Sequence, residues 1–123
     1  IKEKIANYKL DCVLWGFQPV QKMPDFLNCV DVLVLPSKNE GLPLIALEAM
    51  SCGANVVGTR AGGIPEAIGD DYCVEFSENF VSDFADKVLS VLNNPSEQEC
   101  SDCFSWQKTA EKENEIYKSL IKD

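Results

Sequence analysis

The chain has 123 residues, which is enough for one domain with its own core. Its formal net charge is −9, from 20 acidic and 11 basic residues. Nucleic-acid binding needs a clustered basic surface, so we expect no nucleic-acid partner. The chain has no histidine, which excludes Ser-His-Asp and Cys-His nucleophile systems and removes the commonest zinc ligand.

Six cysteines are present. Four of them lie in apolar runs, where we expect buried free thiols that pack as small hydrophobic groups: Cys12, Cys29, Cys52 and Cys73. Cys100 and Cys103 form a single C-x-x-C without the second pair that a structural zinc site needs, so we expect no metal there. Free thiols, no signal peptide and no apolar run of about 18 residues are typical of a cytoplasmic protein.

The first third of the chain predicts a helix, a strand and a second helix. Residues 2–9 read as the end of a helix, and the chain starts there without methionine, as a fragment would. Residues 12–16, "CVLWG", predict a short buried strand closed by glycine. Pro24 suits the first turn of a helix whose apolar face comprises Phe26, Leu27 and Val30.

The middle of the chain alternates strands and helices. Residues 32–35, "VLVL", predict a parallel strand covered on both faces. A helix is expected from about Pro43 to Ser51, with Gly53 as its C-terminal stop. Residues 54–59 predict the next strand, which a glycine-rich turn and a short helix follow.

The last part predicts a short strand at residues 71–76 and two helices. The first of these helices, at residues 79–94, should bury one side: Val81, Phe84, Val88, Leu89 and Leu92. The second should start near Ser105 and carry four aromatic or apolar residues at near-helical spacing: Trp106, Ala110, Tyr117 and Ile121. This order predicts an α/β fold, a Rossmann-like parallel sheet with helices on both faces, in one domain over residues 1–123.

Ligands of open parallel sheets bind beyond the carboxyl ends of the strands, so the loop after Leu35 is the first candidate site. Gly41 allows close approach to the backbone just before a helix whose N-terminal amides and dipole suit a phosphate. Pro43 has no N–H, so the predicted donors are the amides of Gly41, Leu42 and Leu44.

Two carboxylates flank this element in the spacing E-x7-E: Glu40 in the loop and Glu48 in the helix. On a continuous helix this spacing is about 12 Å, which is too far for a pair acting on one bond but suits two contacts along a long ligand with sugar hydroxyls. The alternative to ligand binding is that Glu40 is only a solvated loop residue and Glu48 only part of an exposed helix face. Gly62 and Gly63, after the next strand, predict either close ligand approach or only a tight turn.

Residues 31–68, "DVLVLPSKNEGLPLIALEAMSCGANVVGTRAGGIPEAI", resemble the signature of the group 1 glycosyltransferases, family 4 of the retaining nucleotide-sugar enzymes. The matching pieces are the proline-serine after the strand, E-G-L-P for the usual E-G-F-G, "LEAMSCG" and G-G-x-P-E. Residues 104–120 resemble that family's last helix. Residues 13–32, "VLWGFQPVQKMPDFLNCVDV", resemble the family's lead-in to this signature, so the resemblance covers almost the whole chain.

The resemblance implies a GT-B architecture, of which this chain would be the incomplete C-terminal, donor-binding domain without the N-terminal acceptor domain. It implies sugar transfer from a nucleoside-diphosphate sugar to a saccharide or lipid-linked acceptor, with retention and without a metal or other cofactor. It further implies a cytoplasmic enzyme, with the inner face of the membrane as an option for the full-length protein. The basic pair that stabilises the leaving diphosphate lies upstream of this chain in the family.

Carried over by position, Glu40 is the catalytic candidate and would contact the donor sugar's hydroxyls, while Glu48 would hold the ribose. The predicted donor-binding residues are Glu40, Gly41, Leu42, Pro43, Leu44, Glu48, Gly62 and Gly63. Two alternatives stay open at this point: a nucleotide-sugar-binding module without chemistry, and another GT-B enzyme such as a sugar-nucleotide epimerase, which the lack of histidine disfavours.

Overall fold

The computed structural model describes residues 2–96, 98 and 104–121, so Cys100 and Cys103 lie outside the described residues. The elements follow in this order: α1 Lys2–Tyr8, η1 Val20–Lys22, α2 Met23–Leu27, β1 Val32–Leu35, α3 Leu44–Ser51, β2 Asn55–Thr59, α4 Ile64–Ile68, η2 Asp70–Tyr72, β3 Cys73–Val74, α5 Phe80–Asn93 and α6 Trp106–Leu120. None of the helices in these described parts is long and apolar enough to cross a bilayer.

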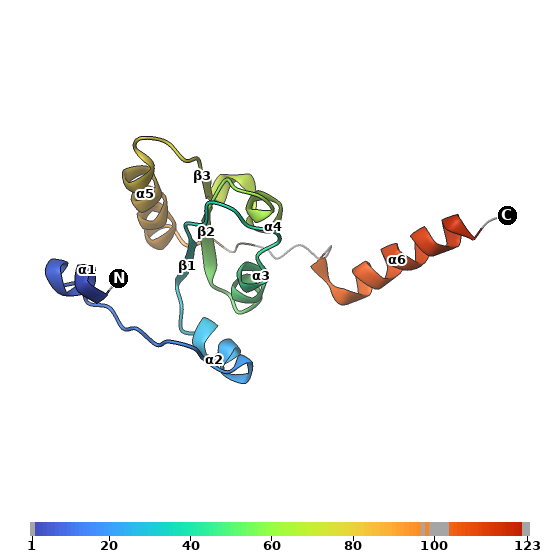
Figure 1. The fold of residues 1–123 in the computed structure, drawn as a ribbon, viewed down its shortest axis with the longest axis horizontal. Coiled ribbons are helices and arrows are strands. Elements are labelled where there is room, and N and C mark those ends of the chain that lie inside the picture. The colour runs from blue at the N-terminus through green and yellow to red at the C-terminus, as the bar shows by residue number, and fades with distance from the viewer. Residues whose placement is uncertain (1, 97, 99–103, 122–123) are drawn as a thin grey trace.

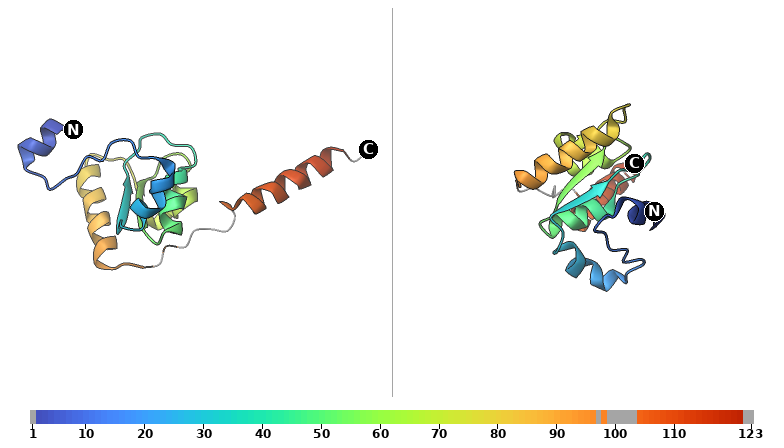
Figure 2. Two further views of the ribbon diagram at one scale, coloured as in Figure 1. Left: turned by 90° about the horizontal axis from the view of Figure 1, so that it is seen from below. Right: turned by 90° about the vertical axis from the view of Figure 1, so that its left-hand side faces the viewer.

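The three strands form one parallel sheet in the order β1-β2-β3. Val32 pairs with Asn55 and Gly58 pairs with Cys73. The central strand β2 is buried along its whole length, because α3 and α4 cover one face of the sheet and α5 covers the other (Figures 1 and 2). The predicted Rossmann-like parallel sheet with helices on both faces is therefore confirmed.

The core lies between β2 and the helices α3 and α4. Ala46 and Ala49 of α3 are fully buried, and these small side chains let the helix lie close to Val56 and its neighbours in β2. Leu27 anchors α2 to the same cluster, and Ile64 does so for α4. This packing fixes where α3 begins, and with it the loop after β1.

The bounds of α3 agree with the prediction. Pro43 is its N-cap, and Ala46 donates the first intrahelical hydrogen bond to the Pro43 carbonyl at 2.9 Å. At the other end Gly53 has a φ of 85°, the left-handed conformation that glycine adopts freely, and the Ala54 amide donates back to Ala49 at 3.0 Å.

The strand predicted at residues 12–16 is wrong. These residues are all described, and they form an exposed, extended segment in which Val13 is 71% exposed. Trp15 contacts Phe26 of α2 edge-on, with ring centroids 5.6 Å apart, instead of entering the sheet. A strand exists only when its backbone finds a partner, and a short apolar run says nothing about that partner.

The buried face predicted for α5 is half wrong. Phe84 and Val88 do lie toward the sheet, but Val81, Leu89 and Leu92 are exposed. The buried stripe instead runs through Phe80, Phe84, Val88 and Val91. The Phe80 ring contacts the rings of Phe76 and Phe84 at tilted angles, with centroids 4.5 and 5.3 Å away. The two stripes share Phe84 and Val88 and differ by one position at their ends, with Phe80 in place of Val81 and Val91 in place of Leu92, so both fit the same period.

The expected burial of four cysteines holds for only one. Cys73 in β3 is buried, Cys52 is half-buried, and Cys12 and Cys29 are exposed, although all four are free thiols. Cys12 belongs to the segment that does not enter the sheet, and Cys29 follows α2 on its solvent side.

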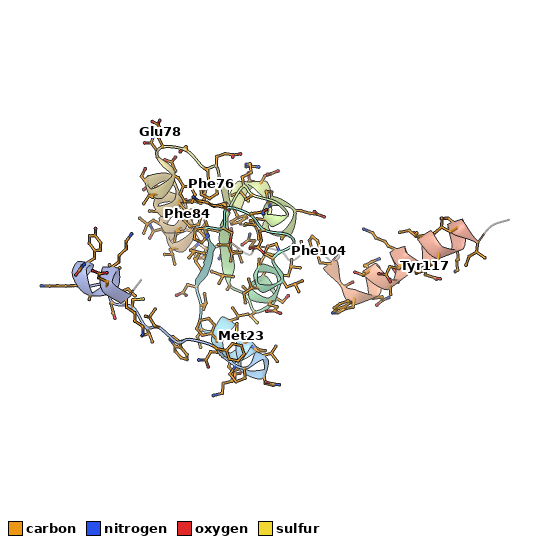
Figure 3. All side chains as sticks on the ribbon, viewed as in Figure 1. Met23, Phe76, Glu78, Phe84, Phe104 and Tyr117 are labelled. Atoms are coloured by element: carbon orange, nitrogen blue, oxygen red, sulfur yellow. The ribbon has the colours of Figure 1, made fainter. Side chains whose placement is uncertain are left out.

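The final helix, α6, forms where predicted, and the Ser105 hydroxyl caps it by accepting from the Lys108 amide at 3.2 Å. Its apolar residues are exposed, since Trp106 is 89% and Tyr117 62% exposed. Figure 1 shows α6 away from the sheet and its covering helices, and Figure 3 shows Tyr117 far from Phe84 in the core region.

Candidate functional site

Two loops meet at the carboxyl edge of the sheet. Because β1 and β2 are parallel, the loops after Leu35 and after Thr59 leave from the same edge. The Gly63 amide donates to the Gly41 carbonyl at 3.0 Å and lies 3.4 Å from the Glu40 carbonyl. The prediction that Gly41 and Gly63 lie near one sheet edge is confirmed.

The contact between these loops is a backbone contact without side chains. A Cβ on Gly62 would lie 1.7 Å from the Glu40 carbonyl oxygen, and a Cβ on Gly63 would lie 2.4 Å from the Gly41 carbonyl oxygen. Carbon and oxygen atoms cannot approach so closely, so both positions require glycine. Gly62 also has a φ of 55°, in the left-handed region.

The base of the second loop is tied down by Thr59 and Arg60. Thr59 is fully buried, and its hydroxyl donates to the carbonyl of Ser37 in the first loop. Arg60 forms ion pairs with Asp70 and with Glu75, the latter at 2.8 Å, and its amide donates to Val74 at 2.9 Å. The turn between β2 and α4 is therefore held on both sides.

The start of α3 presents amides toward this edge. In the described parts of the chain, nothing accepts a hydrogen bond from the amides of Gly41, Leu42 or Leu44. Leu42 is 40% and Leu44 64% exposed, whereas Pro43 is buried. Unpaired amides at the positive end of a helix dipole can bind an anion.

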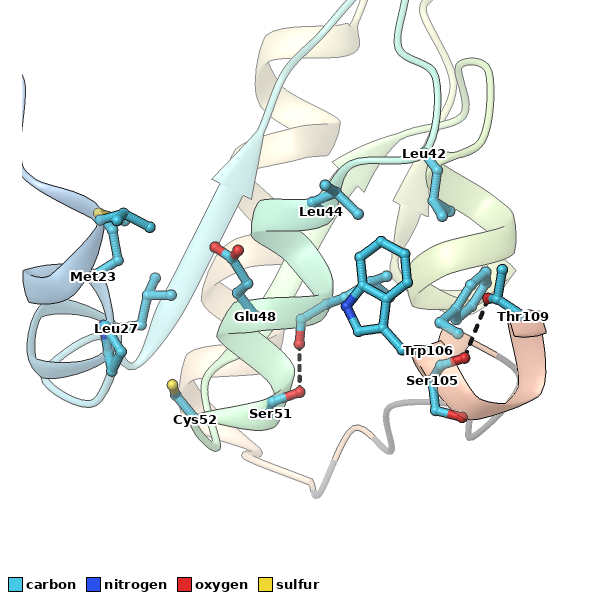
Figure 4. A pocket seen from close by; sticks show the side chains of 14 residues that line it. Met23, Leu27, Leu42, Leu44, Glu48, Ser51, Cys52, Ser105, Trp106 and Thr109 are labelled. Atoms are coloured by element: carbon cyan, nitrogen blue, oxygen red, sulfur yellow. Dashed lines mark hydrogen bonds between the residues drawn. The ribbon is translucent and has the colours of Figure 1, made fainter. Parts of the chain in front are cut away.

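A cavity of about 880 Å³ lies beside α3, next to α2 and the start of α6. Figure 4 shows Glu48 on α3 between Met23 and Leu27 on one side and Leu44 and Trp106 on the other. The described lining is mostly apolar, and Glu48 carries its only charge: Val20, Met23, Pro24, Leu27, Leu42, Leu44, Leu47, Glu48, Ser51, Cys52, Phe104, Ser105, Trp106 and Thr109.

The predicted site residues thus form two adjoining groups. Half-buried Glu40 lies with the glycines at the meeting point of the two loops, and exposed Glu48 lies in the cavity. Leu42 joins the groups, because it lines the cavity and its Cα would lie 3.4 Å from a Cβ on Gly63.

The sequence reasoning missed the other walls of the cavity. Leu27 was expected only on the apolar face of a helix and Trp106 only among the apolar residues of the last helix, and Met23 was not singled out. Their common signal was an apolar residue near the start of a short or late helix. That signal does not say which surface the helix will face.

Comparison with known proteins decides the family. The family described as Glycosyl transferases group 1 matches residues 1–94 of the 123. The chain belongs to this family. The match includes both loops, the sheet and α3, so the resemblance of residues 31–68 is confirmed.

Curated relatives of this group 1 glycosyltransferase chain agree. A glycosyltransferase of Methanocaldococcus jannaschii, itself uncharacterized, is 31% identical over 87% of this chain and 33% of its own length. A D-inositol 3-phosphate glycosyltransferase of Saccharomonospora viridis is 33% identical over 85% of this chain and 27% of its own length. An alpha-maltose-1-phosphate synthase of Mycolicibacterium smegmatis is 31% identical over 83% of this chain and 30% of its own length.

The chain spans about a third of the length of these relatives or slightly less. What they share with it is therefore a part of each protein, which holds the two loops and α3.

Metal binding is not indicated by the described side chains. Among residues 2–96, 98 and 104–121, no group of three or more histidine, cysteine or acidic side chains is placed to hold a metal ion. The expectation of a reaction without metal or other cofactor stays a prediction.

Proposed function

We propose that this chain binds the nucleoside-diphosphate sugar of a glycosyltransferase, which transfers the sugar to a saccharide or lipid-linked acceptor with retention. One observation carries the proposal: Glu40 at the meeting point of the two loops, the unpaired amides at the start of α3 and Glu48 in the adjoining cavity follow one another along the segment after β1. A donor of this class has three parts in the same order, namely sugar, diphosphate and nucleoside.

The cavity beside α3 suits the nucleoside. Its apolar walls can cover a flat base, and the Glu48 carboxylate can accept two hydrogen bonds from a vicinal ribose diol. Because Glu48 carries the only charge among the described lining residues, its pairing with the diol would set the position of the nucleoside.

The amides of Gly41, Leu42 and Leu44 suit the diphosphate, with Pro43 fixing the start of the helix. No basic side chain lies among the described residues of the cavity wall, and Arg60 is paired with two carboxylates. We propose that the cations for the leaving diphosphate come from outside this chain, from an earlier part of the same donor-binding domain.

Glu40 suits the sugar, because it lies beyond the amides at the meeting point with Gly62 and Gly63. Its carboxylate would accept hydrogen bonds from the sugar hydroxyls close to the reacting carbon, where charge develops in the transition state. The proposed enzyme works in the cytoplasm, which the four free thiols of the described chain support.

Two substitutions in the full-length protein test this arrangement. Glu48→Ala should weaken binding of the nucleoside diphosphate about 10- to 100-fold, because a charged acceptor contributes about 1.5–3 kcal/mol. Glu40→Ala should leave that affinity unchanged and lower turnover, because its partner is the sugar. Calorimetry with UDP and GDP and steady-state kinetics with the corresponding sugar nucleotides measure both effects.

Asp86→Ala is the matched control, since it removes one exposed carboxylate from α5 on the opposite face of the sheet. Equal loss of nucleotide affinity in both glutamate variants, or in neither, contradicts the two-contact arrangement. Normal binding without any transfer by the full-length protein would instead favour a binding module.

A further inference from the structure

The Gly62–Gly63 turn touches the Glu40–Gly41 peptide more closely than any side chain could. We propose that this turn is a positioning element, whose function is to hold the backbone of Glu40 in place. The inference rests on the proposed function, in which Glu40 contacts the donor sugar. It gives the second glycine loop a role that acts through Glu40 and requires no ligand contact of its own.

Conformation alone does not explain both glycines. Gly16 and Gly53 have φ values of 65° and 85°, and a Cβ on either would meet nothing within 4 Å, so only their backbone conformation favours glycine. Gly63 is the opposite case: its φ is −85°, which any residue adopts, yet a Cβ there would lie 2.4 Å from the Gly41 carbonyl oxygen. Glycine at position 63 is required by the facing loop.

Gly62 makes the contact with Glu40 itself. A Cβ on Gly62 would lie 1.7, 2.9 and 3.3 Å from the carbonyl oxygen, the carbonyl carbon and the amide nitrogen of Glu40. The backbone of Glu40, from its amide to its carbonyl, is therefore in close contact with the Gly62 backbone. Any side chain at position 62 would displace it by about 1 Å or more before normal van der Waals separation is restored.

The Gly62–Gly63 turn is itself restrained by contacts of the two residues at the end of β2 and just after it, so it can restrain the facing loop. Thr59 donates its buried hydroxyl to Ser37, and Arg60 is paired with Asp70 and Glu75. Glu48 belongs to a different support, because α3 places it through the buried Ala46 and Ala49. A displaced turn should therefore move Glu40 and leave Glu48 in place.

The test is a double-mutant cycle in the full-length protein with UDP-glucose and GDP-mannose as probes. The rate measured is the release of nucleoside diphosphate from the donor that the wild type uses. Gly63→Ala should lower this rate about 100-fold, as expected for a 1 Å misplacement. The affinity for free UDP or GDP should fall too, but by much less than the rate, because the added Cβ also faces Gly41 and Leu42, whose amides suit the diphosphate. In a Glu40→Ala background the same Gly63→Ala change should lower the rate by less than about twofold, because its effect passes through Glu40.

Gly53→Ala is the control, since it places alanine at positive φ with open space around it, and it should leave the rate unchanged. Hydrogen exchange of the amides of residues 38–42 should rise in Gly63→Ala and not in Gly53→Ala. If Gly63→Ala does not fold, Thr59→Val replaces it in the cycle, because it removes only the hydroxyl bond to Ser37.

An unchanged rate in the folded Gly63→Ala or Thr59→Val variant overturns this inference, and so does a fall of equal size with and without Glu40. A wild-type protein that binds none of UDP, GDP, ADP, CDP and dTDP overturns the proposed function and, with it, this inference. If Glu40→Ala and Glu48→Ala have the effects predicted above but the turn variants leave the rate unchanged, only the positioning role is overturned.

Discussion

At the scale of single residues, the Cys73 thiol differs most from the other described cysteines. Burial raises the pKa of this thiol above its ordinary value, while the nearby Arg60 lowers it and Glu75 raises it further. Its Sγ also lies 3.4 Å from the Gly69 carbonyl oxygen, to which it donates. The thiol is therefore neutral at physiological pH and poorly nucleophilic.

We accordingly predict an order of alkylation in the native protein. Cys12 and Cys29 should react with iodoacetamide first, and Cys73 should react last, because it is both buried and protonated. Peptide mass spectrometry over a time course measures the order. In urea the difference should vanish, and early labelling of Cys73 in native buffer would contradict its burial.

The same pKa shift predicts a dependence of stability on pH. The unfolded thiol ionises near its ordinary pKa, about 8.5, whereas the folded thiol stays neutral to higher pH. The free energy of unfolding therefore falls as the pH rises from the unfolded pKa to the folded pKa. Cys73→Ala should lack this part of the fall. Urea unfolding of both proteins at pH 7.5 and 9.5 measures it, and parallel pH profiles would contradict the assignment.

At the scale of secondary-structure elements, α5 offers a matched pair of valines. Val91 is 8% exposed and faces the sheet, whereas Val81 is 80% exposed on the same helix. Val91→Ala should cost about 2 kcal/mol of unfolding free energy, from lost burial and the cavity left behind. Val81→Ala should change it by less than about 0.5 kcal/mol. Equal costs by urea titration would contradict the observed face.

The same helix shows what the sequence could and could not predict. Its span followed from apolar periodicity and Pro95, but only part of its buried face did, because stripes that share two residues and differ by one position at their ends fit the same period. The strand expected at residues 12–16 failed for a related reason, since a strand depends on a partner that the run does not specify.

The candidate site was predictable where topology alone decides. Parallel strands put the loops of Gly41 and Gly63 at one edge, whatever the side chains do. The cavity around Glu48 was not predictable, because its walls come from α2 and α6, whose placement depends on tertiary packing. The atomic contact between Gly62 and Glu40 likewise appears only in three dimensions.

At the scale of the whole molecule, the chain matches only 27–33% of the length of its relatives. We predict that the isolated 123-residue chain transfers no sugar from UDP-glucose or GDP-mannose to a saccharide acceptor. It supplies carboxylates and amides, but no described basic side chain of the cavity wall to stabilise the leaving diphosphate.

Chromatographic analysis of product over long incubations measures this activity, with the full-length protein as the positive control. Turnover by the isolated chain at more than about one-hundredth of the full-length rate would contradict the need for residues outside it.

The sequential strand order also bears on how the molecule is made. Each strand pairs with the one that precedes it in the chain, so the sheet can grow from β1 to β3 as the polypeptide leaves the ribosome. The contact of Gly62 and Gly63 with Glu40 and Gly41 lies beside β1 and β2, and the Arg60 that supports it is paired with Asp70 and Glu75 on either side of β3. We expect the proposed donor edge to take shape during translation once β3 has emerged, before α5 and α6 have left the ribosome.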